Sequence, residues 1–203
     1  MAEPLGIIEI LGLAASISLL AGWRLYLCML ATGVAMRMGV LSLPEHLESL
    51  AVLANPWVMG IAGVAAVIEF FADKIAWLDS AWDGLHTLIR PLGGALLTLA
   101  IVDPSDPAFQ VIAFILGGGA TLLSHGGKAG ARALVNTSPE PFSNVAVSAG
   151  EDVATSGLLV LALAFPALAI VIAIALLAAA FLLLRMAGNV LKRLFGTRRE
   201  PAP

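Results

Sequence analysis

The sequence has little charge for its length of 203 residues. Charged side chains make up 12% of it and hydrophobic ones 60%, whereas a soluble domain is about a quarter charged and about half apolar. The mean hydropathy is +0.97. This composition excludes an ordinary soluble domain. The net charge of −3 is also too small to indicate nucleic acid as a partner.

Cysteine and the common catalytic motifs are also scarce. The one cysteine, Cys28, cannot form an internal disulfide, so no redox compartment follows from it. The sequence contains no Gly-x-x-x-x-Gly-Lys-Ser/Thr phosphate loop, no Gly-x-Ser-x-Gly elbow and no His-Glu-x-x-His motif. An enzyme is therefore the less favoured class of function, and no cofactor is expected.

Long apolar runs dominate what is present. Six apolar segments lie at about residues 5–36, 56–71, 91–102, 107–123, 145–165 and 166–185. A run of roughly 18 uncharged apolar residues can cross a bilayer, and backbone groups in lipid must be satisfied internally, which favours helices. We therefore predict an all-α bundle of about six transmembrane helices. It forms one domain over residues 1–190, followed by a basic cytoplasmic tail over residues 191–203.

Two features modify that simple scheme. The first segment carries Arg24 between Gly22 and Gly33, and two of the later segments are short, so broken or re-entrant segments are expected. In addition, residues 18–24 resemble residues 121–128 with one insertion. An inverted 3+3 repeat, as is frequent in transporters, is one interpretation of this similarity. Chance is the other, because the match is short.

The basic residues predict an orientation. In a six-helix scheme most of the eleven lysines and arginines fall on one side: Lys74, Arg90, Lys128, Arg132, Arg185, Lys192, Arg193, Arg198 and Arg199. Only Arg24 and Arg37 fall on the other. Cytoplasmic loops carry an excess of Lys and Arg, so both termini are expected to be cytoplasmic.

Charged residues inside or beside the apolar segments are the candidate binding or transport residues. A charge at the bilayer centre costs about 2.5–3.5 kcal/mol on the mildest scale, so it is expected to face the bundle interior, a partner charge or water. Eight residues are candidates of this kind: Arg24, Glu69, Asp73, Lys74, Lys128, Arg132, Glu151 and Asp152. We expect Glu69 and Glu151 to face the interior, within hydrogen-bonding reach of one of these cations.

Less specific interpretations of the same residues remain open. Arg24, beside Trp23 and Tyr26, could extend its side chain to the membrane surface. Lys128 and Arg132 could lie in a cytoplasmic loop. The acidic residues could form ion pairs with a structural role only.

A further polar stripe lies between the second and third apolar segments. Its members would share one face of a helix: Asp79, Asp83, His86 and Arg90. Trp77 and Trp82 flank the stripe and are of a type favoured at membrane interfaces, which favours an amphipathic surface helix with the stripe towards water. The alternative is a divalent metal or proton site built from Asp79, Asp83 and His86, with no fourth ligand evident.

These residues resemble a known pattern. The sequence is similar to an uncharacterised bacterial family of small membrane proteins, the domain-of-unknown-function family numbered 4126. The resemblance covers about residues 5–184 and is carried by residues 22–24, 69–75, 79, 83–86, 90–95, 128, 132, 136, 144 and 151–152. It implies a multi-helix fold, in the bacterial cytoplasmic (inner) membrane, and draws attention to these polar residues. It implies no substrate and no reaction.

Two functions follow as alternatives. The leading one is a small transporter or channel with a charged intramembrane site for an ion, a solute or an anionic headgroup. The other is a non-catalytic membrane scaffold or lipid-binding subunit with structurally paired charges. Membrane lipids, and an ion or small anionic solute, are the expected partners, and the sequence is compatible with a homo-oligomer. A polar cavity lined by charged residues would favour transport, and a dry, fully paired core would favour the scaffold.

Overall fold

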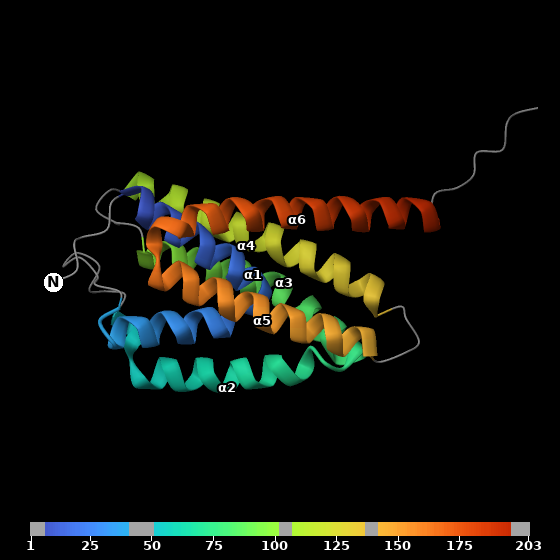
Figure 1. Ribbon diagram of the computed structural model, residues 1–203, viewed down its shortest axis with the longest axis horizontal. Coiled ribbons are helices and arrows are strands. Elements are labelled where there is room, and N and C mark those ends of the chain that lie inside the picture. The colour runs from blue at the N-terminus through green and yellow to red at the C-terminus, as the bar shows by residue number, and fades with distance from the viewer. Residues whose placement is uncertain (1–6, 41–50, 102–106, 137–141, 196–203) are drawn as a thin grey trace, which may run out of the picture.

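The computed structural model describes residues 7–40, 51–101, 107–136 and 142–195. Within these residues the chain forms helices and no strands (Figure 1). The helices are α1 (Ile7–Arg37), α2 (Pro56–Ala72), α3 (Ala76–Ile101), α4 (Pro107–Val135), α5 (Phe142–Ala164) and α6 (Pro166–Phe195). The predicted all-α bundle is confirmed. Of the tail expected at residues 191–203, residues 191–195 continue α6, and the rest lies outside the described residues.

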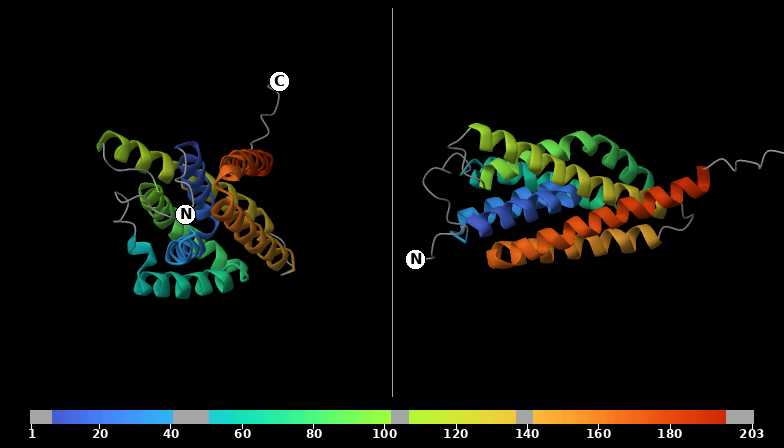
Figure 2. Two further views of the ribbon diagram at one scale, coloured as in Figure 1. Left: turned by 60° about the vertical axis from the view of Figure 1, so that its left-hand side comes forward. Right: turned by 90° about the horizontal axis from the view of Figure 1, so that it is seen from above.

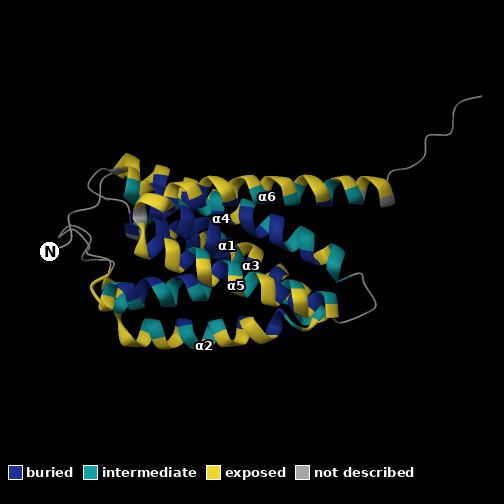
Figure 3. Cartoon of the chain, in the orientation of Figure 1, coloured by how far each residue is buried: buried dark blue, intermediate teal, exposed yellow. Residues whose placement is uncertain are grey.

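The bundle carries apolar side chains on its outside and charged ones within. Four of the described helices, α1, α4, α5 and α6, are long and apolar enough to cross a membrane. Large apolar side chains point outward from α2 and α6, such as those of Ile61, Val64, Ile174 and Phe181, each at least 59% exposed (Figure 3). Patches of this size are rare on soluble monomers, whereas hydrocarbon is the natural solvent for them. The fold is that of a membrane protein.

Helix α1 is broken at Arg24. The backbone there has φ −143° and ψ 76°, far from helical values, so two helical segments meet at this residue. The first segment runs beside α4 in the same direction: Thr121 donates to the Ser18 carbonyl at 2.7 Å, and Lys128 to the Trp23 carbonyl at 3.3 Å. The predicted break in this apolar segment is confirmed.

The second segment of α1 turns back. Leu30 lies against Gly63 of α2, and Arg37 reaches the Ala54 carbonyl just before α2, at 3.4 Å. As the chain advances along the second segment of α1, its contacts move back towards the start of α2. The second segment of α1 and α2 are therefore antiparallel. Because α2 and α4 run in the same direction in the bundle, the two segments of α1 form a re-entrant hairpin with Arg24 at its tip (Figures 1 and 2).

This hairpin sets where the described helices begin and end. The start of α1 and the end of α6 lie at opposite ends of the bundle, because α1 returns to the end from which it starts (Figure 1).

Helix α3 also differs from its prediction. Residues 76–101 form one helix with Pro91 inside it, where the sequence suggested a surface helix followed by a short apolar segment. The expectation that the polar stripe faces water is wrong, since Asp79, Asp83, His86 and Arg90 are at most 5% exposed. Polar partners on α1, α2 and α4 meet this stripe, so burying it does not leave its charges unpaired.

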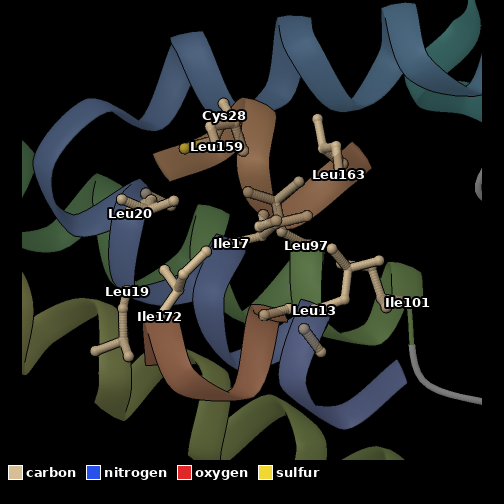
Figure 4. Close-up of a cluster of buried hydrophobic side chains, with 14 of the residues drawn as sticks. Leu13, Ile17, Leu19, Leu20, Cys28, Leu97, Ile101, Leu159, Leu163 and Ile172 are labelled. Atoms are coloured by element: carbon tan, nitrogen blue, oxygen red, sulfur yellow. The ribbon is translucent and has the colours of Figure 1, made fainter. Parts of the chain in front are cut away.

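An apolar core supports the other end of the hairpin. Leu13 and Ile17 of α1 pack with Leu97 of α3, Leu159 of α5 and Ile172 of α6, all at most 8% exposed (Figure 4). Small residues let helices approach closely in membranes. A Cβ on Gly22, for example, would lie 2.6 Å from the carbonyl oxygen of Thr121. This contact brings the tip of the hairpin against α4.

Candidate functional site

Ionisable side chains from five helices gather inside the bundle near the tip of the hairpin. We call the following residues the charged network: Arg24, Glu69, Asp73, Lys74, Asp79, Asp83, Arg90, Lys128, Arg132, Glu151 and Asp152. All eight candidate binding residues from the sequence belong to it. Lys74, Glu151 and Asp152 are half-buried, and the others are buried.

The break in α1 explains why cations collect there. The last carbonyls of a helical segment lack partners within the helix, and the carboxyl end of a helix carries partial negative charge. Arg90 donates to the Gly22 carbonyl at 3.2 Å, and Lys128 to that of Trp23 at 3.3 Å. Both cations therefore cap the first segment of α1.

The end of α2 supplies the central carboxylate. Asp73 is the C-terminal cap of α2 and is fully buried. Its Oδ2 accepts hydrogen bonds from Arg24 and from Lys128, the latter at 2.7 Å. Its backbone carbonyl accepts from the Arg132 guanidinium and from the Asn144 side chain. Asp73 thereby joins the hairpin tip to α4 and α5, and Arg24 does not extend to the membrane surface.

Arg90 holds the second node of the network. It donates to Glu69 at 2.6 Å and to Asp83 at 3.0 Å, and both Arg90 and Glu69 are at most 1% exposed. Glu69 faces the interior as expected. Its partner, however, is Arg90, which was not among the cations expected for it, because Arg90 was assigned to a surface helix.

The third node lies between α3 and α4. Arg132 contacts Asp79 at 3.0 Å and donates to the Asn144 carbonyl at 3.0 Å. Asn136 also donates to Asp79, at 2.7 Å. Arg132 and Asp79 are at most 1% exposed. Arg132 is therefore an interior residue of α4, which excludes the alternative of an exposed cytoplasmic loop.

The network opens towards the surface between α2 and α5. Asp152 accepts from Lys74 at 2.9 Å and lies 2.7 Å from Arg24. Glu151 Oε2 lies 3.7 Å from Arg24 and 3.8 Å from Lys128. These distances suit ion pairs but exceed hydrogen-bond length, so the hydrogen bond expected for Glu151 is not formed. The side chains of Lys74, Glu151 and Asp152 are 13–22% exposed.

Comparison with known families adds a classification. Residues 11–186 match the family described as a domain of unknown function, DUF4126. The chain belongs to the DUF4126 family. The matched residues reach from α1 into α6 and contain the entire charged network. No curated protein and no solved structure matches the chain.

Two histidines border the charged network of this DUF4126 protein. Arg90 can only donate, so its 2.7 Å contact with His125 Nδ1 fixes that nitrogen as an acceptor and the ring as neutral. His86 Nδ1 faces the Trp82 carbonyl at 2.8 Å, so it carries the hydrogen, and Nε2 faces the Tyr26 hydroxyl at 3.0 Å. His125 is not among the residues predicted from the sequence, although it lies one helical turn before Lys128, on the same face.

The predicted metal alternative gains no support from this DUF4126 structure. Among the residues that the structure describes, no three His, Cys, Asp or Glu side chains are grouped to hold a metal ion. Asp79 faces Arg132, Asp83 faces Arg90, and His86 faces Tyr26. The stripe thus contributes its charges to the network.

Several charged atoms in the DUF4126 network lack a hydrogen-bond partner. Within the described part of the chain, these are Arg24 Nε, Glu69 Oε2, Asp73 Oδ1, Arg90 Nε and Glu151 Oε2. Buried polar atoms are nearly always paired with protein or with ordered water. Buried water requires two to four polar partners, which this cluster supplies. These unpartnered atoms could therefore bind water or a small ion.

A separate cavity of about 520 Å³ lies between the first segment of α1, α4 and α6. Its lining is almost entirely apolar and includes residues such as Leu19, Ile112 and Ile174, with Ser18 and Thr98 as its hydroxyl groups. No member of the charged network lines this cavity. The polar cavity that would favour transport is thus not this one, and any polar ligand must be sought within the network.

Proposed function

We propose that the protein is a small transporter or channel of the bacterial cytoplasmic membrane, with the charged network as the binding site for an ion. The observation that carries the proposal is the broken helix α1, whose tip residue Arg24 forms ion pairs with the buried Asp73 at the end of α2 and the half-buried Asp152 of α5. Transporters commonly build ion sites at the break of discontinuous helices. In this chain the carbonyls at the break accept from Arg90 and Lys128, so the side chains around the break form the site.

The unpartnered charged atoms favour binding over a purely structural role. A network that only stabilises the fold gains from satisfying every buried donor and acceptor. Here Asp73 Oδ1 and Glu69 Oε2 are buried in carboxylates that are at most 1% exposed, yet no group of the described residues donates to them. Such oxygens are suited to a proton, a water molecule or a small cation.

The basic residues at the helix ends support an orientation. Lys192 and Arg193 lie in the last turn of α6, and Arg37 lies in the last turn of α1. These two helix ends lie at opposite ends of the bundle (Figure 1). By the excess of basic residues in cytoplasmic loops, the α6 end is cytoplasmic. The start of α1 is then on the outer side, with α2 to α6 as the crossing helices. Membrane lipids are the partners that cover the apolar outer faces.

The scaffold remains the second candidate, because Arg90 holds one node of the network through several contacts at once. Arg90 is fully buried and contacts Glu69, Asp83, His125 and the Gly22 carbonyl at once. Removing one partner of a buried pair of this kind destabilises the fold by about 3–5 kcal/mol. This node has the geometry of a structural pair.

Ligand-dependent melting in detergent tests the function. A ligand that binds the folded state raises its stability by RT ln(1 + [L]/Kd), so the melting temperature is measured against pH, NaCl and KCl, with choline chloride at equal ionic strength as the control. We expect protons, Na⁺ or K⁺ to raise the melting temperature beyond the choline control. A melting temperature that responds to none of them contradicts an ion site and favours the scaffold.

A further inference from the structure

The charged network holds one carboxylate more than it holds cations. Its cations are Arg24, Lys74, Arg90, Lys128 and Arg132, and its carboxylates are Glu69, Asp73, Asp79, Asp83, Glu151 and Asp152. That is five against six. The histidines do not change this balance. His125 accepts from Arg90, and the contacts of His86 suit a neutral ring that donates to the Trp82 carbonyl and accepts from the Tyr26 hydroxyl. A net charge in the membrane interior costs several kcal/mol, so the surplus is expected to be neutralised by a bound cation or proton.

The surplus carboxylate is identified by its contacts. The other five each have a cation nitrogen within 3.0 Å: Glu69 and Asp83 at Arg90, Asp73 at Lys128, Asp79 at Arg132, and Asp152 at Arg24 and Lys74. Glu151 has its nearest cations at 3.7 and 3.8 Å. Its Oε2 is buried and accepts no hydrogen bond from any described residue. Glu151 is therefore the carboxylate that the network leaves uncompensated.

The surroundings of Glu151 select a proton over a metal ion. A metal ion needs several oxygen or nitrogen ligands, and the described residues contain no such group. A proton needs no coordination shell, because it forms a covalent bond to the carboxylate oxygen itself.

We propose that Glu151 is the proton-binding residue of this protein and exchanges its proton through the half-exposed opening between α2 and α5. The carboxylate takes the proton from hydronium, which leaves water, and returns it in the same way. The side chain is 13% exposed, next to Asp152 and Lys74 at 22% and 21%. The deeper carboxylates of Asp73 and Glu69 are at most 1% exposed, so Glu151 is the member nearest to water that still faces the network interior.

The proton on Glu151 is linked to the hairpin tip through its neighbours. The charged groups around Glu151 come from every side of the network: Arg24 of α1, Asp73 and Lys74 at the end of α2, Lys128 and Arg132 of α4, and Asp152 of α5. When Glu151 is ionised, it attracts Arg24 and Lys128, which also hold Asp73 and the Trp23 carbonyl. Proton binding thus weakens the electrostatic attraction between Glu151 and Arg24, the residue at the break of α1. The inference rests on the proposed function and names its ligand.

Infrared titration of the purified protein tests this assignment. In the wild type, raising the pH should remove one C=O stretching band of a protonated carboxyl group, with release of one proton per chain. Glu151→Gln should lack both the band and the released proton. The matched control is Glu9→Gln, which removes a carboxylate in the first turn of α1, outside the charged network, and should keep both signals.

Two results would overturn the inference: a wild type without a titrating carboxyl band, or a band that persists in Glu151→Gln. Melting curves show that the variants are folded, and Glu151→Asp, which retains a carboxyl group, should restore a titrating band. The outcome is separate from that of the proposed function. A band assigned to Glu151 together with no ion movement in proteoliposomes would leave the proton site in place and remove transport.

Discussion

Replacing Glu69 by Gln should reduce stability far more than the same replacement at Glu151. Both changes keep the size of the side chain and remove one negative charge. Glu69 is 1% exposed and bonds the fully buried Arg90 at 2.6 Å, whereas Glu151 Oε2 forms no hydrogen bond with a described residue. The two variants therefore separate the structural node of the network from the site proposed to bind a proton.

The magnitude follows from the contacts that remain. Breaking a buried ion pair costs about 3–5 kcal/mol, and Arg90 keeps Asp83 at 3.0 Å, so about 3 kcal/mol is expected for Glu69→Gln. A loss of 1 kcal/mol lowers the melting temperature by roughly 2–4 °C in a protein of this size. The expected shift is thus about 6–12 °C. For Glu151→Gln, which loses no hydrogen bond, we expect about 0.5 kcal/mol or less, or roughly 1–2 °C.

Thermal melting in one detergent, followed by tryptophan fluorescence, measures both shifts under the same conditions. Arg90→Gln should lower the melting temperature at least as much as Glu69→Gln, since it strands two carboxylates. Equal shifts for Glu69→Gln and Glu151→Gln would refute the distinction between the two sites. A Glu69→Gln protein as stable as the wild type would refute the structural role of the Arg90 node.

Two further predictions concern the hairpin. Gly22→Ala should destabilise the protein by roughly 1–3 kcal/mol, the usual cost of overpacking, because its Cβ would lie 2.6 Å from a backbone oxygen. The control Gly119→Ala, with no atom within 4 Å of its Cβ, should be neutral or stabilising. Similar melting temperatures for both variants would contradict the close α1–α4 contact. In a Cys28→Ser background, an impermeant maleimide added outside the cell should label Met38→Cys but not Lys192→Cys, and the reverse pattern would invert the proposed orientation.

The helices and the break in α1 could be predicted because their signals are local. Apolar runs define membrane helices through their length alone, and a charge between two glycines marks Arg24 as a discontinuity. The same local signals could not place the ends of the chain, since a break does not say whether the second segment continues or turns back. That outcome depends on packing of the second segment against α2, through contacts such as Leu30 with Gly63.

The partners within the network were harder to predict. A polar stripe on a helix has the same periodicity whether it faces water or a polar interior, so Asp79 to Arg90 was assigned to the surface and the Glu69–Arg90 pair was missed. The pairing depends on how α2, α3 and α4 are rotated about their axes, which a single sequence does not encode locally. The inverted 3+3 repeat stays a prediction, as does the basic tail beyond residue 195.

Charge movement across a membrane tests the central claim most directly. Proteoliposomes on a solid-supported membrane are exposed to jumps of pH, Na⁺ or K⁺, and the capacitive current is recorded. We predict a transient current on the pH jump for the wild type, retained in Glu9→Gln, outside the charged network, and abolished in Glu151→Gln at unchanged protein content. No current for any of the three ions would contradict the claim that the charged network carries an ion and would leave a membrane scaffold with paired charges.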